Sequence, residues 1–104
     1  MQLEKFKIKV TENELYVVYE TLETGCDVMV KNMVTKLLVC ELNSILKKLL
    51  PKYTYPKKQN TISLTAAEAI AFWIVFNTYD FDLAGDLIFA TMRRVLDAIH
   101  KQYL

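Results

Sequence analysis

The acidic residues near position 80 have the outline of a calcium-binding loop. In the segment DFDLAGDLIFAT, Asp80, Asp82 and Gly85 stand at positions 1, 3 and 6 of an EF-hand pattern. The pattern fails where calcium needs oxygen ligands, because position 5 is Ala84 and position 12 is Thr91 instead of a bidentate glutamate. The two aspartates are better explained as the cap and first-turn acids of a helix. The sequence therefore predicts no metal site and no cofactor.

The single histidine and the two cysteines form no catalytic arrangement. His100 stands beside Lys101 near the end of the last expected helix, where a cation complements the helix dipole. Cys26 and Cys40 are expected on one helix about 21 Å apart, too far for a disulfide. We expect both to be free thiols that pack as small hydrophobic side chains. Since no glycine-rich loop is present to hold a phosphate, we predict no enzymatic activity.

A segment rich in lysine and tyrosine, residues 47–58, is the main local charge feature. No acidic residue occurs between Glu41 and Glu68. Lysines interleaved with aromatic residues can hold single-stranded nucleic acid, because tyrosine stacks on a base while lysine neutralises phosphate. The simpler interpretation is a solvated helix end and linker. The candidate nucleic-acid contacts are Lys47, Lys48, Lys52, Tyr53, Tyr55, Lys57 and Lys58.

A helix-turn-helix is a second candidate for nucleic-acid binding. Its turn would lie at Gly25, and the residues presented outward by its second helix would be Lys31, Asn32, Thr35 and Lys36. That second helix is longer than a recognition helix needs to be. The net charge is only +1, so any nucleic acid would have to bind a local patch of the surface.

Composition favours one helical domain over residues 1–104. Apolar residues make up 53% of the chain and charged residues 24%, which is typical of a globular protein. Two glycines and two prolines are too few for an all-β protein with many tight turns. The N-terminal segment lacks the apolar region and cleavage site of a signal peptide, and no apolar run approaches the length of a membrane span. We therefore expect a cytoplasmic protein that does not enter a membrane.

Two short segments alternate apolar and polar residues and lead into a helix cap. Residues 5–10 and 61–64 have the two-residue period of a half-buried strand. Each is followed by Thr-x-x-Glu, the capping box that begins a helix, at residues 11–14 and 65–68. The two strands are expected to pair as an antiparallel ribbon.

The spacing of apolar residues predicts a mainly α fold that resembles a four-helix bundle. The expected helices are 12–24, 27–50, 66–79 and 82–103. Gly25 should end the first helix and Pro51 the second. The order strand, helix, long helix occurs twice, which predicts half-repeats over 3–50 and 60–104 related by a pseudo-two-fold axis. Two ordinary capped helices that happen to follow two strands would produce the same pattern.

The helix expected over 66–79 is apolar on every side. Glu68 is its only polar residue between Ala66 and Phe76, and eleven residues span only about 16 Å, half of a bilayer core. Such a helix must be covered all round, so we expect it at the centre of the domain with Trp73 buried. The alternative leaves one of its faces for a partner.

The two long helices carry more apolar surface than one neighbouring helix can cover. Contiguous apolar patches are rare on monomeric proteins, and a two-fold dimer is the commonest way to cover one. We therefore predict a non-enzymatic protein–protein interaction or assembly module that acts as a homodimer, with a nucleic-acid-binding regulator as the alternative. The expected interface residues are Met29, Met33, Leu37, Phe89, Met92, Leu96 and Tyr103.

Overall fold

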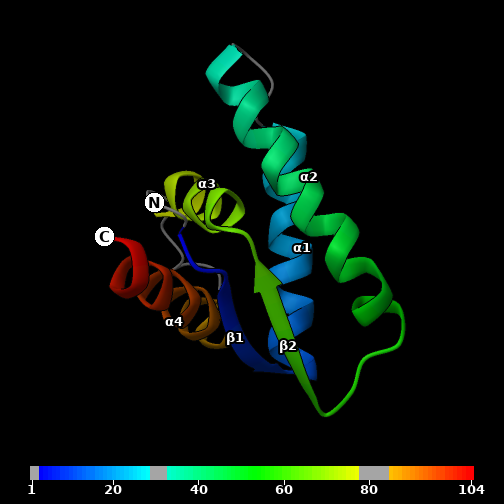
Figure 1. Cartoon of the computed structure of the whole chain (residues 1–104). Helices are drawn as coiled ribbons and strands as arrows, with labels where there is room; N and C mark the ends of the chain where they lie inside the picture. The colour runs from blue at the N-terminus through cyan, green and yellow to red at the C-terminus, as the bar shows by residue number, and fades with distance from the viewer. Residues whose placement is uncertain (1–2, 29–32, 78–84) are drawn as a thin grey trace.

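The computed structural model of the chain describes residues 3–28, 33–77 and 85–104 (Figure 1). The elements are β1 (Phe6–Thr11), α1 (Glu12–Val28), α2 (Met33–Thr54), β2 (Gln59–Leu64), α3 (Ala66–Phe76) and α4 (Asp86–Tyr103). This part of the chain is mainly helical with one two-stranded antiparallel sheet, which confirms the predicted class of fold. No helix in these ranges is both long and apolar enough to cross a membrane.

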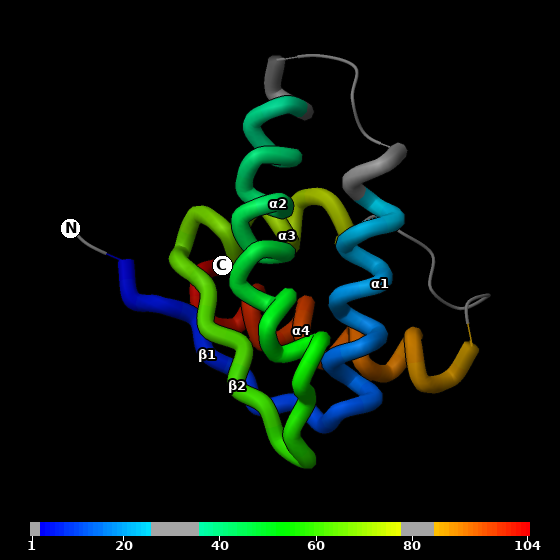
Figure 2. The backbone as a smooth tube through the Cα atoms, turned by 90° about the vertical axis from the view of Figure 1, so that its right-hand side faces the viewer, coloured from blue at the N-terminus to red at the C-terminus, as the bar shows by residue number. Residues whose placement is uncertain are grey.

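The helices surround one apolar core behind the β ribbon. α1 packs against α2 and α4, and α3 packs against the same two helices. Figures 1 and 2 show α1 and α2 side by side and running in opposite directions, with the ribbon on one side of the molecule. The largest side chains that are completely buried include Phe6, Leu15, Leu22, Leu42, Ile45, Leu49, Phe72, Phe76, Met92, Leu96 and Ile99.

The two predicted strands are present and paired. β1 and β2 run antiparallel in a register that places Ile8 opposite Ile62 and Lys9 opposite Thr61. Side chains alternate between the faces of the ribbon, so Phe6 and Val10 on β1 point into the core while the intervening lysines remain exposed. The half-buried strand predicted from alternation is therefore confirmed.

Side chains of the helices bond the backbone along both long edges of this ribbon. On the β1 edge, Arg94 of α4 donates to the carbonyl oxygen of Lys9 at 3.1 Å, and Gln102 donates to that of Lys5 at 3.1 Å. On the β2 edge, Lys52 of α2 donates to the carbonyl oxygen of Thr61 at 2.6 Å. Backbone groups that a strand edge would leave open are thus satisfied by side chains.

Both predicted capping boxes begin their helices as expected. The Thr11 N–H donates to Glu14 at 2.9 Å, and the Glu14 N–H donates to the Thr11 hydroxyl at 3.2 Å. Thr65 and Glu68 repeat the pair of bonds at 2.8 and 3.2 Å. Each box satisfies two backbone donors that the first turn of a helix leaves without partners.

The predicted helix ends at Gly25 and Pro51 are wrong. α1 continues through Gly25 to Val28, and a Cβ atom at this position would lie 2.7 Å from the ring of Phe76. The glycine is needed for close packing of α1 against α3. Pro51 lies inside α2, which ends at Thr54. Since Pro51 is exposed, the backbone bond that proline removes is lost on a surface where water can replace it.

The extension of α1 also overturns the expectation for the cysteines. Cys26 belongs to α1 and Cys40 to α2, so they do not share a helix. Cys40 is a free thiol on the surface, and it does not pack as a small hydrophobic side chain.

The hydroxyl of Thr91 is the one buried side-chain polar atom in the described part of the chain that has no hydrogen-bond partner. We expect Thr91→Val to raise the free energy of unfolding by about 1 kcal/mol, because it replaces an unsatisfied hydroxyl by a methyl group of similar size. Urea unfolding followed by circular dichroism measures the change. Thr24→Val is the control, since Thr24 is exposed and should give a change within about 0.5 kcal/mol. A Thr91→Val protein less stable than the wild type would contradict the assignment.

Candidate interaction surfaces

The predicted lysine and tyrosine segment covers the last two turns of α2 and the connection to β2. Tyr53 stacks on Tyr19 with ring centroids 4.1 Å apart, meets Tyr16 edge-on at 5.2 Å, and is half-buried. Its hydroxyl donates to Glu20 at 3.4 Å. Partial burial raises the pKa of Tyr53, and the negative charge of Glu20 adds to this effect. Tyr53 therefore packs α2 against α1, and its ring is largely engaged inside the fold.

Lys48 is also used inside the fold. Its ammonium group lies 2.5 Å from the carboxylate of Glu68, which is buried, and the Ser44 hydroxyl donates to the same carboxylate at 2.6 Å. Burial acts to raise the pKa of Glu68, but the bonds from Lys48, Ser44 and the Thr65 N–H together with the Lys48 charge outweigh it. The pKa of Glu68 is therefore held below its ordinary value. Lys48 is the partner of a buried capping residue, so its charge is already paired within the fold.

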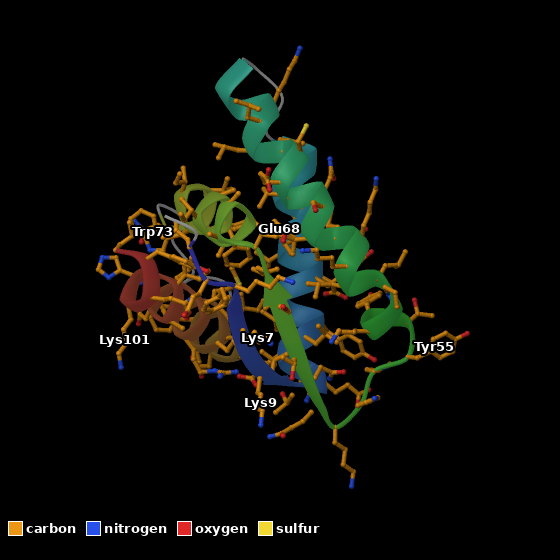
Figure 3. All side chains as sticks on the ribbon, in the orientation of Figure 1. Lys7, Lys9, Tyr55, Glu68, Trp73 and Lys101 are labelled. Atoms are coloured by element: carbon orange, nitrogen blue, oxygen red, sulfur yellow. The ribbon has the colours of Figure 1, made fainter. Side chains whose placement is uncertain are left out.

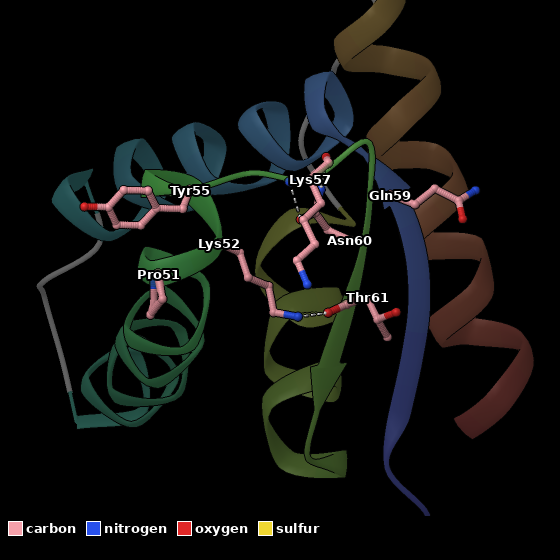
Figure 4. Close-up of a pocket in the computed structure, with 7 residues that line it drawn as sticks. All are labelled: Pro51, Lys52, Tyr55, Lys57, Gln59, Asn60 and Thr61. Atoms are coloured by element: carbon pink, nitrogen blue, oxygen red, sulfur yellow. Dashed lines mark hydrogen bonds between the residues drawn. The ribbon is translucent and has the colours of Figure 1, made fainter.

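Lys52, Tyr55 and Lys57 line an open pocket of about 400 Å³ between the end of α2 and β2. Figure 4 shows Lys52 and Lys57 extending into the space between these elements, and Tyr55 at the rim with its ring turned away from β2. Tyr55 is 82% exposed. The remaining lining residues are Pro51, Gln59, Asn60 and Thr61, so none of the described residues that line the pocket carries a carboxylate.

The outer face of the ribbon continues from this pocket. Thr61 and Gln59 belong to both, and the register places Lys9 directly across from Thr61. Figure 3 shows Lys7 and Lys9 on β1, with Lys101 separate from them on α4. We call this surface the basic face, and its residues are Lys5, Lys7, Lys9, Lys52, Tyr55, Lys57, Lys58, Gln59, Thr61 and Ser63.

The sequence predicted only part of the basic face. The candidates Lys52, Tyr55, Lys57 and Lys58 belong to it, whereas the exposed Lys47 lines a separate shallow pocket beside Leu50. The three lysines of the first strand segment were not recognised as candidates. Their alternation with apolar residues along a strand is the signal that places lysines on one exposed face.

A second candidate surface is the outer side of α3. Every residue of α3 that reaches the surface is apolar: these are Ala66, Ala67, Ile70, Trp73 and Ile74. Trp73 (Figure 3) is half-buried, and the centroid of its ring lies 5.8 Å from that of His100 on α4. The predictions that α3 is covered all round and that Trp73 is buried are therefore wrong, because two neighbouring helices leave one side of α3 open.

On α2, Leu37 extends this apolar character. It is 66% exposed and lies seven residues, about two turns, before Ser44, on the side of α2 that contacts α3. We call the outer side of α3 together with Leu37 the apolar face.

Some of the residues predicted for a dimer interface are exposed and others are buried. Leu37 and Phe89 are exposed, whereas Met92 and Leu96 are buried in the core of one chain, so neither can lie at an interface. α4 turns these two residues toward α1 and α3. Tyr103 is half-buried and its hydroxyl donates to the carbonyl oxygen of Glu4. Met29 and the side chain of Met33 lie outside the described residues.

The helix-turn-helix hypothesis does not agree with the helix geometry. α1 and α2 are an antiparallel pair in Figures 1 and 2, whereas a helix-turn-helix crosses at about 90–120°. Its predicted turn at Gly25 lies within α1. Lys36 is exposed on α2, while Lys31, Asn32 and the side chain of Thr35 lie outside the described residues.

The incomplete calcium pattern lies mostly outside the described residues, which include neither Asp80, Asp82 nor Ala84. Thr91, its twelfth position, lies within α4. Over residues 3–28, 33–77 and 85–104, no three side chains of His, Cys, Asp or Glu are grouped so that they could hold a metal ion.

No protein-family model matches the chain, and neither the curated proteins nor the solved structures include a significant match to it.

Proposed function

We propose that this chain is a non-enzymatic protein–protein interaction module that acts as a homodimer through the apolar face. The observation that carries the proposal is that α3 presents only apolar side chains to the surface, including Ile74 at 48% exposure. A helix that is apolar on every side is normally covered on every side. Because the described helices α2 and α4 cover only part of α3, we expect a partner to cover the remainder.

We further propose that the two halves of the chain are related by an internal two-fold axis. Three observations support this relation. The matching residues Ile8 and Ile62 stand opposite each other in the ribbon, as an axis between them requires. Both first helices begin with a Thr-x-x-Glu box. Each long helix also places a cation on the capping glutamate of the other half, Arg94 on Glu14 and Lys48 on Glu68.

This relation gives an internal comparison for the apolar face, because α1 in the first half corresponds to α3 in the second. The matched positions are Asn13 with Ala67, Tyr16 with Ile70, and Glu20 with Ile74. On α1 these positions are polar, and Tyr16 is covered in part by Tyr53. On α3 the same positions are apolar and no described element covers them. The difference supports a binding role for this side of α3.

A second copy of the chain suits the apolar face because the outer side of α3 carries no charge. In a two-fold dimer the same patch meets itself, so a charge close to the axis would face its own copy. Glu68, the only charged residue of α3, is buried and paired with Lys48. Leu37 adds a large exposed side chain from the adjoining helix.

Analytical ultracentrifugation at micromolar concentration tests the homodimer. We expect the wild type to have the mass of two chains and Ile74→Glu to have the mass of one, because the substitution puts two carboxylates into a desolvated contact. Leu50→Glu is a matched control, since Leu50 is a large apolar residue on another part of the surface and is 49% exposed. This control variant should remain a dimer. Circular dichroism spectra should show that all three proteins are folded.

A wild type with the mass of one chain that does not change on concentration would overturn the homodimer. Dimers that persist in Ile74→Glu but dissociate in Leu50→Glu would place the contact elsewhere and contradict the apolar face.

A further inference from the structure

We infer that the basic face binds single-stranded nucleic acid. This surface is distinct from the apolar face, and the inference does not depend on the proposed dimer. It also differs from the lysine segment predicted from the sequence, because the outer face of the ribbon adds Lys7 and Lys9, with Lys5 just before β1, to the lysines at the end of α2.

The spacing of the ribbon lysines suits a polyphosphate backbone. Lys7 and Lys9 occupy alternate positions of β1, so they point to the same side about 7 Å apart along the strand, and Lys5 directly precedes the strand. A lysine ammonium group acts as a point charge with rotatable donors, and it can meet a phosphate without a fixed geometry. The lysines therefore form a row that can follow one strand without reading its sequence.

The electrostatic surroundings leave these lysines unneutralised. None of the described residues that form the outer face of the ribbon or line the pocket is acidic. Of the carboxylates beside β1, Glu14 is paired with Arg94 at 2.8 Å. Glu12 accepts from the Tyr16 hydroxyl at 3.1 Å and keeps its charge, as does the exposed Glu4, and these two acids lie beyond the two ends of the strand. Positive potential therefore accumulates over the ribbon and the pocket, even though the net charge of the chain is only +1.

The pocket favours a single strand over a duplex. Its volume of about 400 Å³ suits a small group such as one nucleotide, and Lys52 and Lys57 extend into it. Tyr55 stands at the rim with an exposed ring on which an unpaired base can stack. A duplex offers phosphates to the lysines but no free base to the tyrosine.

An acidic membrane fits this surface less well. The outer side chains of the paired strands are Lys7, Lys9, Thr11, Gln59, Thr61 and Ser63, which are all polar. Binding at a lipid interface normally combines basic residues with large apolar side chains that enter the acyl region, and the ribbon presents none.

Fluorescence anisotropy with a labelled mixed-sequence DNA of about 15 nucleotides tests the inference. We expect micromolar binding at about 50 mM salt, with a logarithmic salt slope of about −2 to −4 for three to five phosphate contacts. Lys7→Gln/Lys9→Gln should weaken binding at least about fivefold and make the slope shallower by about 1.4. Tyr55→Leu should weaken binding at least about fivefold while leaving the slope unchanged, because stacking releases no counterions.

The matched control is Lys36→Gln/Lys101→Gln. It removes the same two charges from exposed lysines on α2 and α4 outside the basic face, so it has the same net charge as the ribbon variant. Its affinity should stay within about twofold of the wild type. Circular dichroism and thermal unfolding should show that all variants are folded.

Several results would overturn the inference. One is the absence of binding to the DNA at the lowest salt concentration. Another is an equal loss of affinity in the ribbon variant and its control, which would indicate only general attraction to a polyanion. Tighter binding of a duplex of the same sequence would contradict the single-strand assignment. Binding of phosphatidylserine vesicles in place of DNA, with loss in the ribbon variant, would assign the basic face to lipid.

Discussion

Glu68→Ala will lower the free energy of unfolding by about 3 kcal/mol, the largest effect that we expect from one polar substitution in this chain. Glu68 is buried, and it accepts bonds from Lys48, Ser44 and the Thr65 N–H. Removing the carboxylate ends the capping box of α3 and leaves these donors without their partner. Chemical unfolding measured at neutral pH gives the change.

Glu14→Ala is the matched control for this loss. Glu14 caps α1 with the same two bonds and also accepts from Arg94 at 2.8 Å, but it is only half-buried. We expect a loss of about 1 kcal/mol, since water can replace the bonds that Glu14 made. Equal losses in the two variants would contradict the role that we assign to burial of Glu68.

The acid dependence of stability gives a second readout of Glu68→Ala. Burial acts to raise the pKa of each capping glutamate, but in both the hydrogen bonds and the nearby cation outweigh it. The pKa of each carboxyl group is therefore lower in the folded chain than the ordinary value of 4.5. The unfolded chain takes up these protons first as the pH falls, so the stabilisation is complete above about pH 4.5 and is lost through the folded pKa. Stability of Glu68→Ala should fall less steeply with acid than that of the wild type.

Gly25→Val will lower the free energy of unfolding by about 2–3 kcal/mol, because it forces atoms into a filled part of the core. A Cβ atom at Gly25 would lie 2.7 and 2.9 Å from two atoms of the Phe76 ring, which is itself completely buried. Phe76→Leu replaces that ring by a smaller side chain and leaves room for the valine. The double variant should therefore lose less stability than the sum of the losses in the two single variants. Denaturant unfolding of the four proteins measures this coupling.

Thr24→Val provides the neighbouring control for Gly25→Val. It introduces the same side chain one position earlier in α1, at an exposed site, and should change stability by less than about 0.5 kcal/mol. Additive losses for Gly25→Val and Phe76→Leu would show that the two positions do not meet in the folded chain.

The beginnings of α1 and α3 were predictable because their signals are local. In each capping box the two partners are three residues apart, so their bonds form whenever the helix begins there. Strand alternation is equally local, and it led to the correct pairing of β1 with β2. The predicted order of strands and helices depended on these signals.

The end of α1 was not predictable in the same way. A glycine followed by a new apolar pattern usually marks a helix end, and nothing within α1 distinguishes that role from close packing. The role of Gly25 depends on its contact with Phe76, which lies about half the length of the chain further along the sequence. The error also moved the start of the second helix, and it led to the wrong placement of Cys26 and Cys40 on one helix.

The candidate site shows the same limit of local reasoning. Lys48 and Lys57 belong to one lysine-rich segment, yet only Lys48 reaches a buried carboxylate, and that carboxylate lies twenty residues away. Tyr53 and Tyr55 differ by two positions, which on a helix turns Tyr53 onto Tyr19 and leaves Tyr55 exposed. Composition located the segment, but packing determined which of its members are free to bind.

The bonds from α2 and α4 to the edges of the ribbon have a consequence for how this protein behaves at high concentration. A two-stranded sheet has two edges on which further strands could add, and such addition is the route to fibrous aggregates. Lys52 donates a hydrogen bond to the backbone at the β2 edge, while Arg94 and Gln102 donate to the backbone at the β1 edge. The C-terminal helix thus blocks strand addition to β1, and addition at that edge first requires the helix to detach.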